Sequence, residues 1–563
     1  MMQFSNLHLA IGLALTLTAL SGCGGAGTES GTGGDSGTVT TPDNNNNNGG
    51  DSGGDSGGNS GNDSVGGSTE PSWQAGVFPP ATNFINFCAT PRTGQDPYNN
   101  NQPYPDKAGT MMHEKMWLRS FSNETYLWYD EIADNNPSDF STVASYFEQL
   151  KTTQRNPDNS LKDEFHFSTT YESYQKERQS GVATSYGIHW SAIKTASPDR
   201  NFTIAYVEPN SPAAASGLRR GDRLVSIDGE DFIDGDNVTL FNEALFPSVP
   251  KAYTFVFRPV QGEDKSASMT AVDFEQTPVQ NTKVISHGGK TFGYVQFNQF
   301  IPTAQAPLIA AFDTFKNRNV DELVLDMRYN GGGLVHSAAQ LGYMVAGESS
   351  LSRNFGVTTY NDKRQSDNRT YTFEPRRIDW TRNEFMNDTT LPSLNLSKVY
   401  VLTTDDTASA SEMVINGLRG IDIEVIQIGT TTRGKPYGFV PAPNCGMVYY
   451  TIQSKSANEK GFGDYANGFT PTPASQISGE AGLDAKVPGC QVSDDLSHAL
   501  GDENEQLLAS ALHHSITGAC LISEASGVSA KPDNSEQASE HNAVTLPFKP
   551  LRHGAIHTTL TGQ

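Results

Sequence analysis

The sequence predicts an α/β fold with a mostly parallel sheet, formed by the second half of the chain. After residue 280, apolar strands alternate with helical segments, which is the pattern of a parallel sheet covered by helices. The string ELVLD, residues 322–326, is apolar enough to be a buried parallel strand. Before this region, residues 108–175 carry apolar side chains mostly at three- and four-residue steps, which predicts an N-terminal helical segment.

The other elements of this α/β region follow from the same alternation. A helix begins after Pro302 and runs to Phe315, and another helix follows three consecutive glycines. The string TASASEMVINGL, residues 407–418, has apolar side chains at helical spacing and follows an apolar strand. The expected strands of this region, besides ELVLD, are 291–300, 398–404 and 423–429.

The length and the charge of the chain limit the classes of function. A chain of 563 residues has room for roughly three or four domains and for a sizeable core. Its net charge of −24 argues against binding to nucleic acid or to anionic lipid, because phosphate groups repel an acidic surface. We therefore expect no nucleic-acid partner.

The N-terminus resembles the export signal of a bacterial lipoprotein. Residues 9–20 form an apolar run that is too short to span a bilayer comfortably, and the string LSGC ending at Cys23 resembles a lipobox. This resemblance implies cleavage before Cys23 and lipidation of its thiol, and Gly24 favours the outer membrane. The expected location is the bacterial cell envelope, at the periplasmic face of the outer membrane. An ordinary secreted protein with a cysteine at this position is the alternative.

A low-complexity segment follows the predicted lipidation site. Residues 24–70 are almost entirely Gly, Ser, Asp, Asn and Thr. Such a composition cannot bury enough apolar surface to offset the entropy lost on ordering. We expect a signal peptide at residues 1–22 and a disordered linker at residues 23–75.

The four other cysteines predict two disulfide bonds, because an even number of cysteines in an exported chain favours pairing. Spacing leaves all three connectivities open. We expect Cys445–Cys490, which flank one late segment, and Cys88–Cys520, which would join the two ends of the folded body. The cysteines lack the C-x-x-C spacing of a zinc site, and we expect no metal.

Ser409 has two interpretations. With Glu412 it forms the S-x-x-E pattern of a capping box, in which the serine oxygen and the glutamate carboxylate bind free amides of the first helical turn. Alternatively Ser409 is a nucleophile at a helix start, where free amides and the positive end of the helix dipole favour developing negative charge. The sequence has no G-x-S-x-G elbow, so another pattern must distinguish the two interpretations.

Lys435 and a glycine-rich turn add to the catalytic interpretation. A lysine with an ordinary pKa of about 10.4 is protonated at neutral pH, so a lysine base requires burial that lowers its pKa. Three glycines, residues 331–333, leave backbone amides free next to a substrate, which suits a developing oxyanion. The turn lacks the spacing of a P-loop or of a dinucleotide-binding motif, so we expect no nucleotide cofactor.

The segment from Tyr186 to Asp231 resembles a PDZ domain of the bacterial protease type. The string YGIHW precedes a strand, and SPAAASGLRRGD leads into the strand RLVSIDG. PDZ domains capture a peptide C-terminus as an added strand, with loop amides on the carboxylate. The resemblance assigns this role to Tyr186, Gly187 and Ile188. The alternative is that the glycines of this segment only allow tight turns and have no role in binding.

Four features in order resemble the carboxyl-terminal processing peptidases, also called tail-specific proteases. They are the PDZ-like segment, DMRYNGGG, TASASE and the dipeptide Gly434-Lys435, and the resemblance covers roughly residues 108–520. It implies a crotonase-like ββα catalytic domain with an inserted or preceding PDZ domain. It also implies a serine-type endopeptidase that uses no cofactor and acts on proteins or peptides with free C-termini.

The resemblance also implies the roles of individual residues. Ser409 matches the family's nucleophile and Lys435 its base. The oxyanion amides would be those of Ala410 and of Gly332 or Gly333. Typical family members continue G-K-G-x-V-Q, with the glutamine orienting the lysine, whereas GKPYGF here lacks that glutamine.

The domain boundaries and the competing functions complete these expectations. The expected domains beyond the linker are an N-terminal helical region at 76–178, a PDZ domain at 179–265, a catalytic domain at 266–525 and a C-terminal tail at 526–563. Ser411 is the alternative nucleophile, and an esterase using His336 as the base is an alternative enzyme. A lipoprotein that only binds peptides through its PDZ domain is the alternative outside enzymes.

Overall fold

A computed structural model describes residues 70–156, 159–247, 250–521, 543–544, 555–556 and 560. All of them belong to one compact unit, Gly66–Gln563. The predicted signal peptide, Cys23 and nearly all of the predicted linker lie outside the described residues, as does most of the predicted tail. Among the described residues, no helix combines the length and the apolar character that crossing a membrane requires.

The central sheet confirms the α/β prediction. Its seven strands lie in the order β14-β15-β16-β22-β23-β29-β28, and every neighbouring pair except β14–β15 is parallel. The predicted strands become β15, β16, β22 and β23. The bounds are β14 (Val279–His287), β15 (Lys290–Phe297), β16 (Glu322–Asp326), β22 (Lys398–Thr403), β23 (Glu424–Gly429), β29 (Lys486–Gln491) and β28 (Thr470–Thr472).

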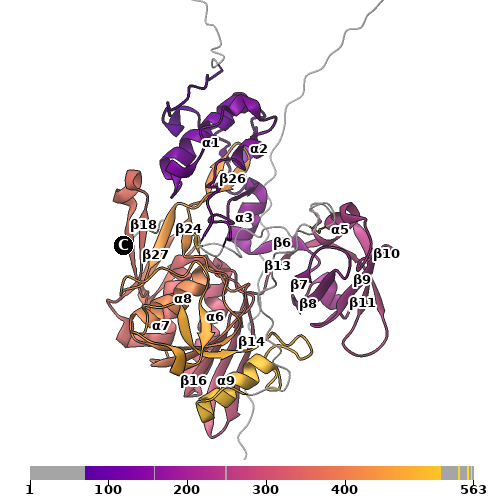
Figure 1. Cartoon of the computed structure of the whole chain (residues 1–563), viewed down its shortest axis with the longest axis vertical. Helices are drawn as coiled ribbons and strands as arrows, with labels where there is room; N and C mark the ends of the chain where they lie inside the picture. Colours follow the sequence, from indigo (N-terminus) through magenta and orange to yellow (C-terminus); the bar gives the residue numbers. More distant parts are fainter. Residues whose placement is uncertain are drawn as a thin grey trace, which may run out of the picture. The chain divides into compact units, whose positions relative to one another are not determined.

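Helices cover both faces of this sheet. Successive side chains of each strand point to opposite faces, so each strand contributes residues to two cores. On one face Leu323 and Val399 pack in the core with residues of α6 (Gln305–Asn317), α7 (Val335–Ala346) and α8 (Ala410–Gly420). On the other face Val324 and Tyr400 pack against α9 (Gln506–Thr517). Figure 1 shows α6, α7 and α8 grouped together and α9, in yellow, apart from them.

A second sheet lies beside the predicted catalytic segments. Its order is β17-β30-β24-β27-β18-β19. The bounds are β17 (Gly333–Leu334), β30 (Ala555–Ile556), β24 (Tyr437–Phe439), β27 (Ser454–Ala457), β18 (Asn354–Tyr360) and β19 (Arg369–Thr372). Residues from the glycine-rich turn, from the segment after Lys435 and from the end of the chain therefore meet in one sheet.

The PDZ-like segment forms a β-domain with its own core of buried residues, among them Phe202, Phe241 and Phe255. Its sheet order is β12-β11-β9-β8-β7, which leaves β7 at an edge. The chain enters and leaves this domain through β6 and β13, which pair antiparallel. The bounds are β6 (Val182–Ser185), β7 (Ile188–Lys194), β8 (Asn201–Val207), α4 (Pro212–Ala215), β9 (Arg223–Ile227), β10 (Glu230–Asp231), α5 (Val238–Leu245), β11 (Ala252–Arg258), β12 (Lys265–Thr270) and β13 (Val272–Glu275).

The N-terminal region is less helical than predicted. The α-helices within residues 108–175 are α1 (Met111–Thr125), the five-residue α2 (Val143–Phe147) and the start of α3 (Tyr171–Ser180). The same range contains the 3₁₀-helices η2 (Tyr129–Glu131) and η3 (Pro137–Asp139) and the strand β5 (Phe167–Thr170). The apolar spacing arose from aromatic side chains that pack against β26 (Met447–Tyr450), such as Trp117, whose ring lies 5.5 Å from that of Tyr449. These aromatic residues form part of a buried core cluster. The shorter strands are β1 (Phe87–Cys88), β2 (Gln95–Asp96), β3 (Gln102–Pro103), β4 (Lys107–Ala108), β20 (Arg376–Asp379), β21 (Glu384–Thr390) and β25 (Ala442–Asn444).

The expected disulfide pairing is wrong. The bonds are Cys88–Cys445 and Cys490–Cys520, not Cys445–Cys490 and Cys88–Cys520. Cys445 lies in the turn of the β25–β26 hairpin, which packs beside the N-terminal region, where Asn86 N–H donates to Asn444 Oδ1 at 2.8 Å. Cys490 lies in β29 of the central sheet, and Cys520 follows α9, which covers that sheet.

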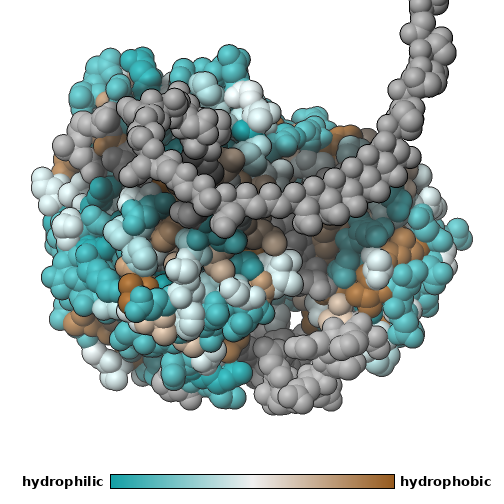
Figure 2. All heavy atoms as spheres, turned by 90° about the horizontal axis from the view of Figure 1, so that it is seen from above, coloured by the Kyte–Doolittle hydropathy of each residue, from teal (hydrophilic) through white to brown (hydrophobic). Residues whose placement is uncertain are grey.

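The surface is mainly hydrophilic, as the net charge leads one to expect. Figure 2 shows hydrophilic residues over most of one face, with hydrophobic residues in small separate areas.

Candidate active site

The predicted catalytic residues follow neighbouring strands of the central sheet. β16 pairs with β22, and β22 pairs with β23, each in parallel. Because parallel strands end at the same edge of a sheet, the segments after them start close together. These segments are the glycine-rich turn after β16, the serine-bearing turn after β22 and the loop to Lys435 after β23.

Ser409 lies immediately before α8 in an unusual backbone conformation. Its φ is 58° and its ψ is −110°, a combination that is uncommon for a residue with a side chain. The residue is 0% exposed, and Oγ has no hydrogen-bond partner among the described residues. A strained backbone that holds an unbonded hydroxyl is typical of functional sites rather than of a simple helix cap.

Glu412 holds the segments of Ser409 and Lys435 together. Its Oε2 accepts hydrogen bonds from Ser409 N–H at 2.7 Å and from Lys435 N–H at 2.8 Å. Its Oε1 accepts from Gly434 N–H at 2.7 Å and from the Thr432 hydroxyl at 2.6 Å. The bond to Ser409 N–H is the glutamate half of the predicted capping box. The same carboxylate also binds the loop that carries the lysine.

Lys435 is fully buried, with 0% of the residue exposed. Burial lowers the pKa of its amine well below the ordinary value, and the negative charges of Asp163 and Glu412 offset this only in part. Nζ lies 3.8 Å from the ring centre of Phe439 and 4.6 Å from that of Phe165. This environment favours a neutral amine, which is the form a general base requires.

The glycine-rich turn packs directly against the serine. A Cβ on Gly332 would lie 2.9 Å from Ala408 O and 3.0 Å from the Cβ of Ser409, so only glycine fits there. Gly332 N–H donates to the side chain of Asn330 at 2.9 Å, which leaves Gly333 as the candidate donor from this turn. The other predicted donor, Ala410, is the first residue of α8, where a backbone N–H has no partner within the helix.

Asn330 is the residue of this site that the sequence interpretation missed. It is 0% exposed, and its side chain donates to Phe297 O at 2.9 Å while accepting from Gly332. Its carbonyl accepts from Ala408 N–H at 3.1 Å and from the Ser411 hydroxyl at 2.8 Å. The sequence signal for this role is an asparagine directly before three glycines. Glycines have no side chains to hold the turn in one conformation, and an asparagine side chain can do so by hydrogen bonds to nearby backbone groups.

The structure disfavours both alternative catalytic residues. The Ser411 hydroxyl donates to Asn330 O, so it is engaged in holding the turn. The His336 ring packs edge-on against Tyr371 at 5.1 Å and Phe385 at 5.5 Å. Because Ser409 Oγ has no partner among the described residues, His336 does not bind it in this structure.

The predicted carboxylate-binding loop lies directly before the edge strand β7. Gly187 has a φ of 79°, and a Cβ there would lie 2.2 Å from the Cβ of Ser211. Its N–H donates to Ser185 Oγ at 3.0 Å, while Tyr186 O and Gly187 O accept from neighbouring turns of the domain. Ile188 begins β7 and pairs with Val207 on one side. The loop is therefore rigid and adjoins an edge to which a peptide strand can add.

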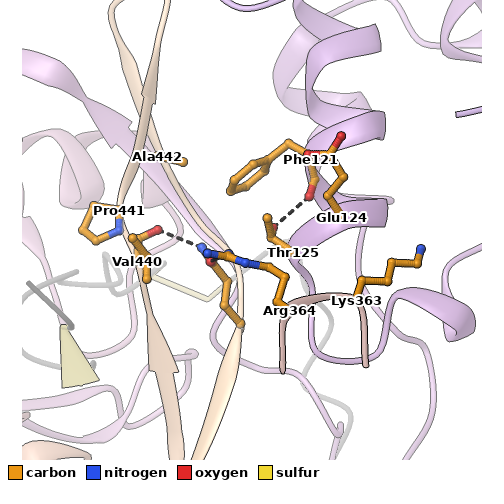
Figure 3. A pocket seen from close by; sticks show the side chains of 9 residues that line it. Phe121, Glu124, Thr125, Lys363, Arg364, Val440, Pro441 and Ala442 are labelled. Carbon is orange, nitrogen blue, oxygen red and sulfur yellow. Dashed lines mark hydrogen bonds between the residues drawn. The ribbon is translucent and has the colours of Figure 1, made fainter. Parts of the chain in front are cut away.

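A surface pocket of about 560 Å³ lies away from these residues (Figure 3). Phe121, Glu124 and Thr125 of α1 line it on one side, facing the segment Val440–Ala442, and Arg364 reaches in between. Neither Ser409 nor Lys435 lines it. Within the described part of the chain, no group of three His, Cys, Asp or Glu side chains is arranged to hold a metal ion.

Comparisons with known proteins agree with this geometry. A model of peptidase family S41 matches residues 291–472, and a PDZ-domain model matches residues 203–239. A carboxyl-terminal-processing protease from Picosynechococcus is 29% identical over 24% of this chain and 32% of its own. A carboxy-terminal processing protease from Bacillus subtilis is 23% identical over 54% of this chain and 61% of its own. The alignments thus span about a third to three fifths of these relatives.

A solved structure extends the similarity beyond the segments that the family models match. A protein from Bacteroides fragilis described as an S41 protease superposes with a TM-score of 0.54 and 26% identity. The match covers 74% of this chain and 98% of that one. The family models, the relatives and the fold agree with the strand-end site described above. Residues 291–472 of the chain thus form a segment of peptidase family S41, and residues 203–239 lie in a PDZ domain.

Proposed function

We propose that this protein is a serine-type endopeptidase in which Ser409 is the nucleophile and Lys435 is the general base. The observation that carries the proposal is that one oxygen of Glu412 binds the amides of both residues. This shared contact keeps the two segments adjacent, although they lie on separate strand-to-helix and strand-to-loop connections. Burial supplies the second requirement, because it lowers the pKa of the lysine.

The proposed reaction is acyl transfer to the serine. Ser409 Oγ attacks the carbonyl carbon of the scissile peptide bond while Lys435 Nζ accepts the hydroxyl proton. The protonated lysine then gives this proton to the leaving amine, and water hydrolyses the acyl-enzyme with the lysine again acting as base. The side chain of Lys435 must move within hydrogen-bonding distance of Oγ for the first step, since catalytic hydrogen bonds often tighten only when substrate binds.

The oxyanion of the tetrahedral intermediate is assigned to two backbone amides. Ala410 N–H lies at the start of α8, where the helix dipole favours negative charge. Gly333 N–H comes from the turn that packs against Ser409, and Gly332 is excluded because its amide already binds Asn330. Removing one such donor typically costs about 100- to 1,000-fold in turnover.

The PDZ domain is proposed to select substrates by their C-terminal tails. The support is that the loop Tyr186–Ile188 lies directly before the edge strand β7, as strand addition of a peptide requires. A carboxylate bound at Gly187 N–H would displace the Ser185 hydroxyl that this amide binds in the structure. Amidating the C-terminus of a peptide ligand should then weaken its binding, because charge-assisted hydrogen bonds are lost. Unchanged binding would assign selection to another surface.

Membrane anchoring through Cys23 is also a proposal, and it rests on the sequence string LSGC alone. Mass spectrometry of the protein from its native membrane should find a lipidated Cys23, and a Cys23→Ser variant should be released into the soluble fraction. An unmodified Cys23 in the native protein would contradict the anchor.

The decisive test of activity is cleavage of casein or of a tailed peptide by the purified chain. Wild type should cleave, whereas Ser409→Ala and Lys435→Arg should not, because arginine keeps the charge but does not deprotonate in a usable range. Ser409→Ala should still bind tailed peptides. Binding without any cleavage by wild type would instead identify a peptide-binding protein on a peptidase scaffold.

A further inference from the structure

A strand from the end of the chain lies between the two segments that flank the candidate active site. β30 (Ala555–Ile556) pairs in parallel with β17 on one side and with β24 on the other. Ala555 stands opposite both Gly333 and Gly438, and Ile556 opposite both Leu334 and Phe439. We call the space between β17 and β24 the strand slot.

The walls of the strand slot come from the catalytic segments. β17 begins at Gly333, the candidate oxyanion donor, next to the glycine that contacts Ser409. β24 begins at Tyr437, two residues after Lys435. A strand in the slot therefore lies between two segments that each adjoin a proposed catalytic residue, and it pairs with both of them. Such edges accept any extended peptide, because strand addition depends mainly on main-chain hydrogen bonds.

The same late segment also contacts the PDZ domain. Val544 N–H donates to Thr195 O at 2.9 Å, and Ala543 pairs antiparallel with Ala196, directly after the edge strand β7. Val544 is 2% exposed and belongs to the core cluster of the PDZ domain. Only eleven positions separate this contact from Ala555.

A third contact lies beyond the strand slot. Leu560 is 5% exposed and packs with Ile378 and Phe385 of the hairpin β20–β21. The late segment, defined here by residues 543–544, 555–556 and 560, is thus buried or paired at each of its described positions.

We propose that the strand slot is the binding surface for an extended peptide substrate, and that the protein's own late segment occupies it as a tethered competitor. This deepens the proposed function and rests on it for the identity of the substrate. A peptide must displace β30 to reach Ser409. Because the competitor is part of the same chain, its binding is intramolecular and does not depend on the protein concentration.

The competition predicts a specific kinetic effect. The chain binds substrate only in the fraction of molecules whose slot is empty, so the apparent affinity is reduced by that fraction. Weakening β30 should raise kcat/KM about tenfold or more and lower KM, while kcat at saturating substrate changes little.

Ile556→Pro tests this in the full-length chain. Proline lacks the N–H that a strand residue donates and is not tolerated in a strand with neighbours on both sides. Ile556→Val keeps the N–H and the preference for strands, and serves as the matched control. We expect increased kcat/KM for the proline variant and an unchanged value for the valine variant. Equal kcat/KM for both variants and wild type would overturn the proposal.

A binding measurement separates this proposal from the peptidase assignment. A labelled peptide of residues 551–560, LRHGAIHTTL, is titrated into Ser409→Ala and into Ser409→Ala/Ile556→Pro, with a scrambled peptide as the control. We expect at least tenfold tighter binding of LRHGAIHTTL to the double variant. If the double variant binds the peptide more tightly but no form that retains Ser409 cleaves a substrate, the proposed peptidase activity is refuted, whereas the proposed peptide binding in the strand slot stands. Equal binding to both forms would refute the slot, even if wild type cleaves.

Discussion

Two buried basic side chains lie after strands of the same sheet, and their surroundings shift their pKa values in opposite directions. Arg328, after β16, is bound by Asp326 at 2.9 Å, by Glu505 at 2.8 Å and by Asp494 at 2.8 Å. Burial alone would lower its pKa, but these carboxylates outweigh burial and raise it well above the ordinary value. For Lys435, beyond β23, burial prevails and the pKa is lowered.

The comparison shows that burial does not by itself decide the charge of a basic side chain. One of the carboxylates around Arg328, that of Asp494, has two further partners. Tyr329 donates a hydrogen bond to it, and Arg220 of the PDZ domain binds it at 2.6 Å. This cluster fixes the start of the glycine-rich turn and contacts the PDZ domain. In contrast, two aromatic rings lie beside the amine of Lys435. The first environment favours a charged side chain, and the second favours a neutral amine, as the proposed base requires.

The largest effect is expected for removal of the buried amine. Lys435→Met replaces the amine by an apolar group of similar length, so kcat/KM should fall by about 100- to 10,000-fold, the usual contribution of a general base. The free energy of unfolding should change by less than about 1.5 kcal/mol, because methionine fills a similar volume in the buried site. Peptide cleavage and urea unfolding measure the two quantities. A folded Lys435→Met chain with near wild-type activity would contradict the role of the lysine.

The opposite pattern is expected for the other cation. Arg328→Met leaves the buried carboxylates of Asp326 and Glu505 without their counter-charge, so unfolding should cost about 3–5 kcal/mol less than in wild type. Arg353→Met is the control, because its ion pair with Glu459 is partly exposed and such pairs contribute about 1 kcal/mol or less. Urea unfolding compares the two variants. Similar small losses for both would mean that the carboxylate cluster contributes little to stability.

The sequence predicted most of the scaffold, because the pattern of apolar residues reports burial directly. ELVLD became β16, and the helix after TASASE became α8. The PDZ strands and the order of the catalytic motifs were also recognisable from short strings. The prediction failed where apolar spacing had another cause, as in the aromatic residues of the N-terminal region that pack against β26.

Contacts between distant segments were not predictable in the same way. Cys88 and Cys445 are 357 positions apart and meet because a hairpin packs on the N-terminal region, which spacing does not reveal. Glu412 was expected to close one helical turn, and its bonds to Gly434 and Lys435 depend on the next strand of the sheet. The effect of Asp163 on the lysine comes from a segment that the sequence interpretation assigned no chemistry.

A smaller effect is expected for the pH dependence of activity. If neutral Lys435 is the base, activity rises with pH through the pKa of its amine. The charge of Asp163 favours the protonated lysine and thus raises that pKa, so Asp163→Asn should move the rise to lower pH by up to about one unit. Tyr126→Phe removes the hydroxyl that donates to Asp163 without changing a charge, and it should leave the profile nearly in place. A profile of Asp163→Asn that moves to higher pH would contradict this electrostatic assignment.

The smallest effect separates the two serines of the TASASE string. Ser411→Ala removes the hydrogen bond to Asn330 O, which should lower the free energy of unfolding by about 1 kcal/mol. Activity should stay within about tenfold of wild type, since the turn keeps the bond from Ala408 N–H to the same carbonyl. Ser409→Ala should show the reverse, with no loss of stability, because Oγ has no partner among the described residues, and with no activity. Urea unfolding and peptide cleavage of both variants give the comparison, and an inactive Ser411→Ala chain of wild-type stability would exchange the roles of the two hydroxyls.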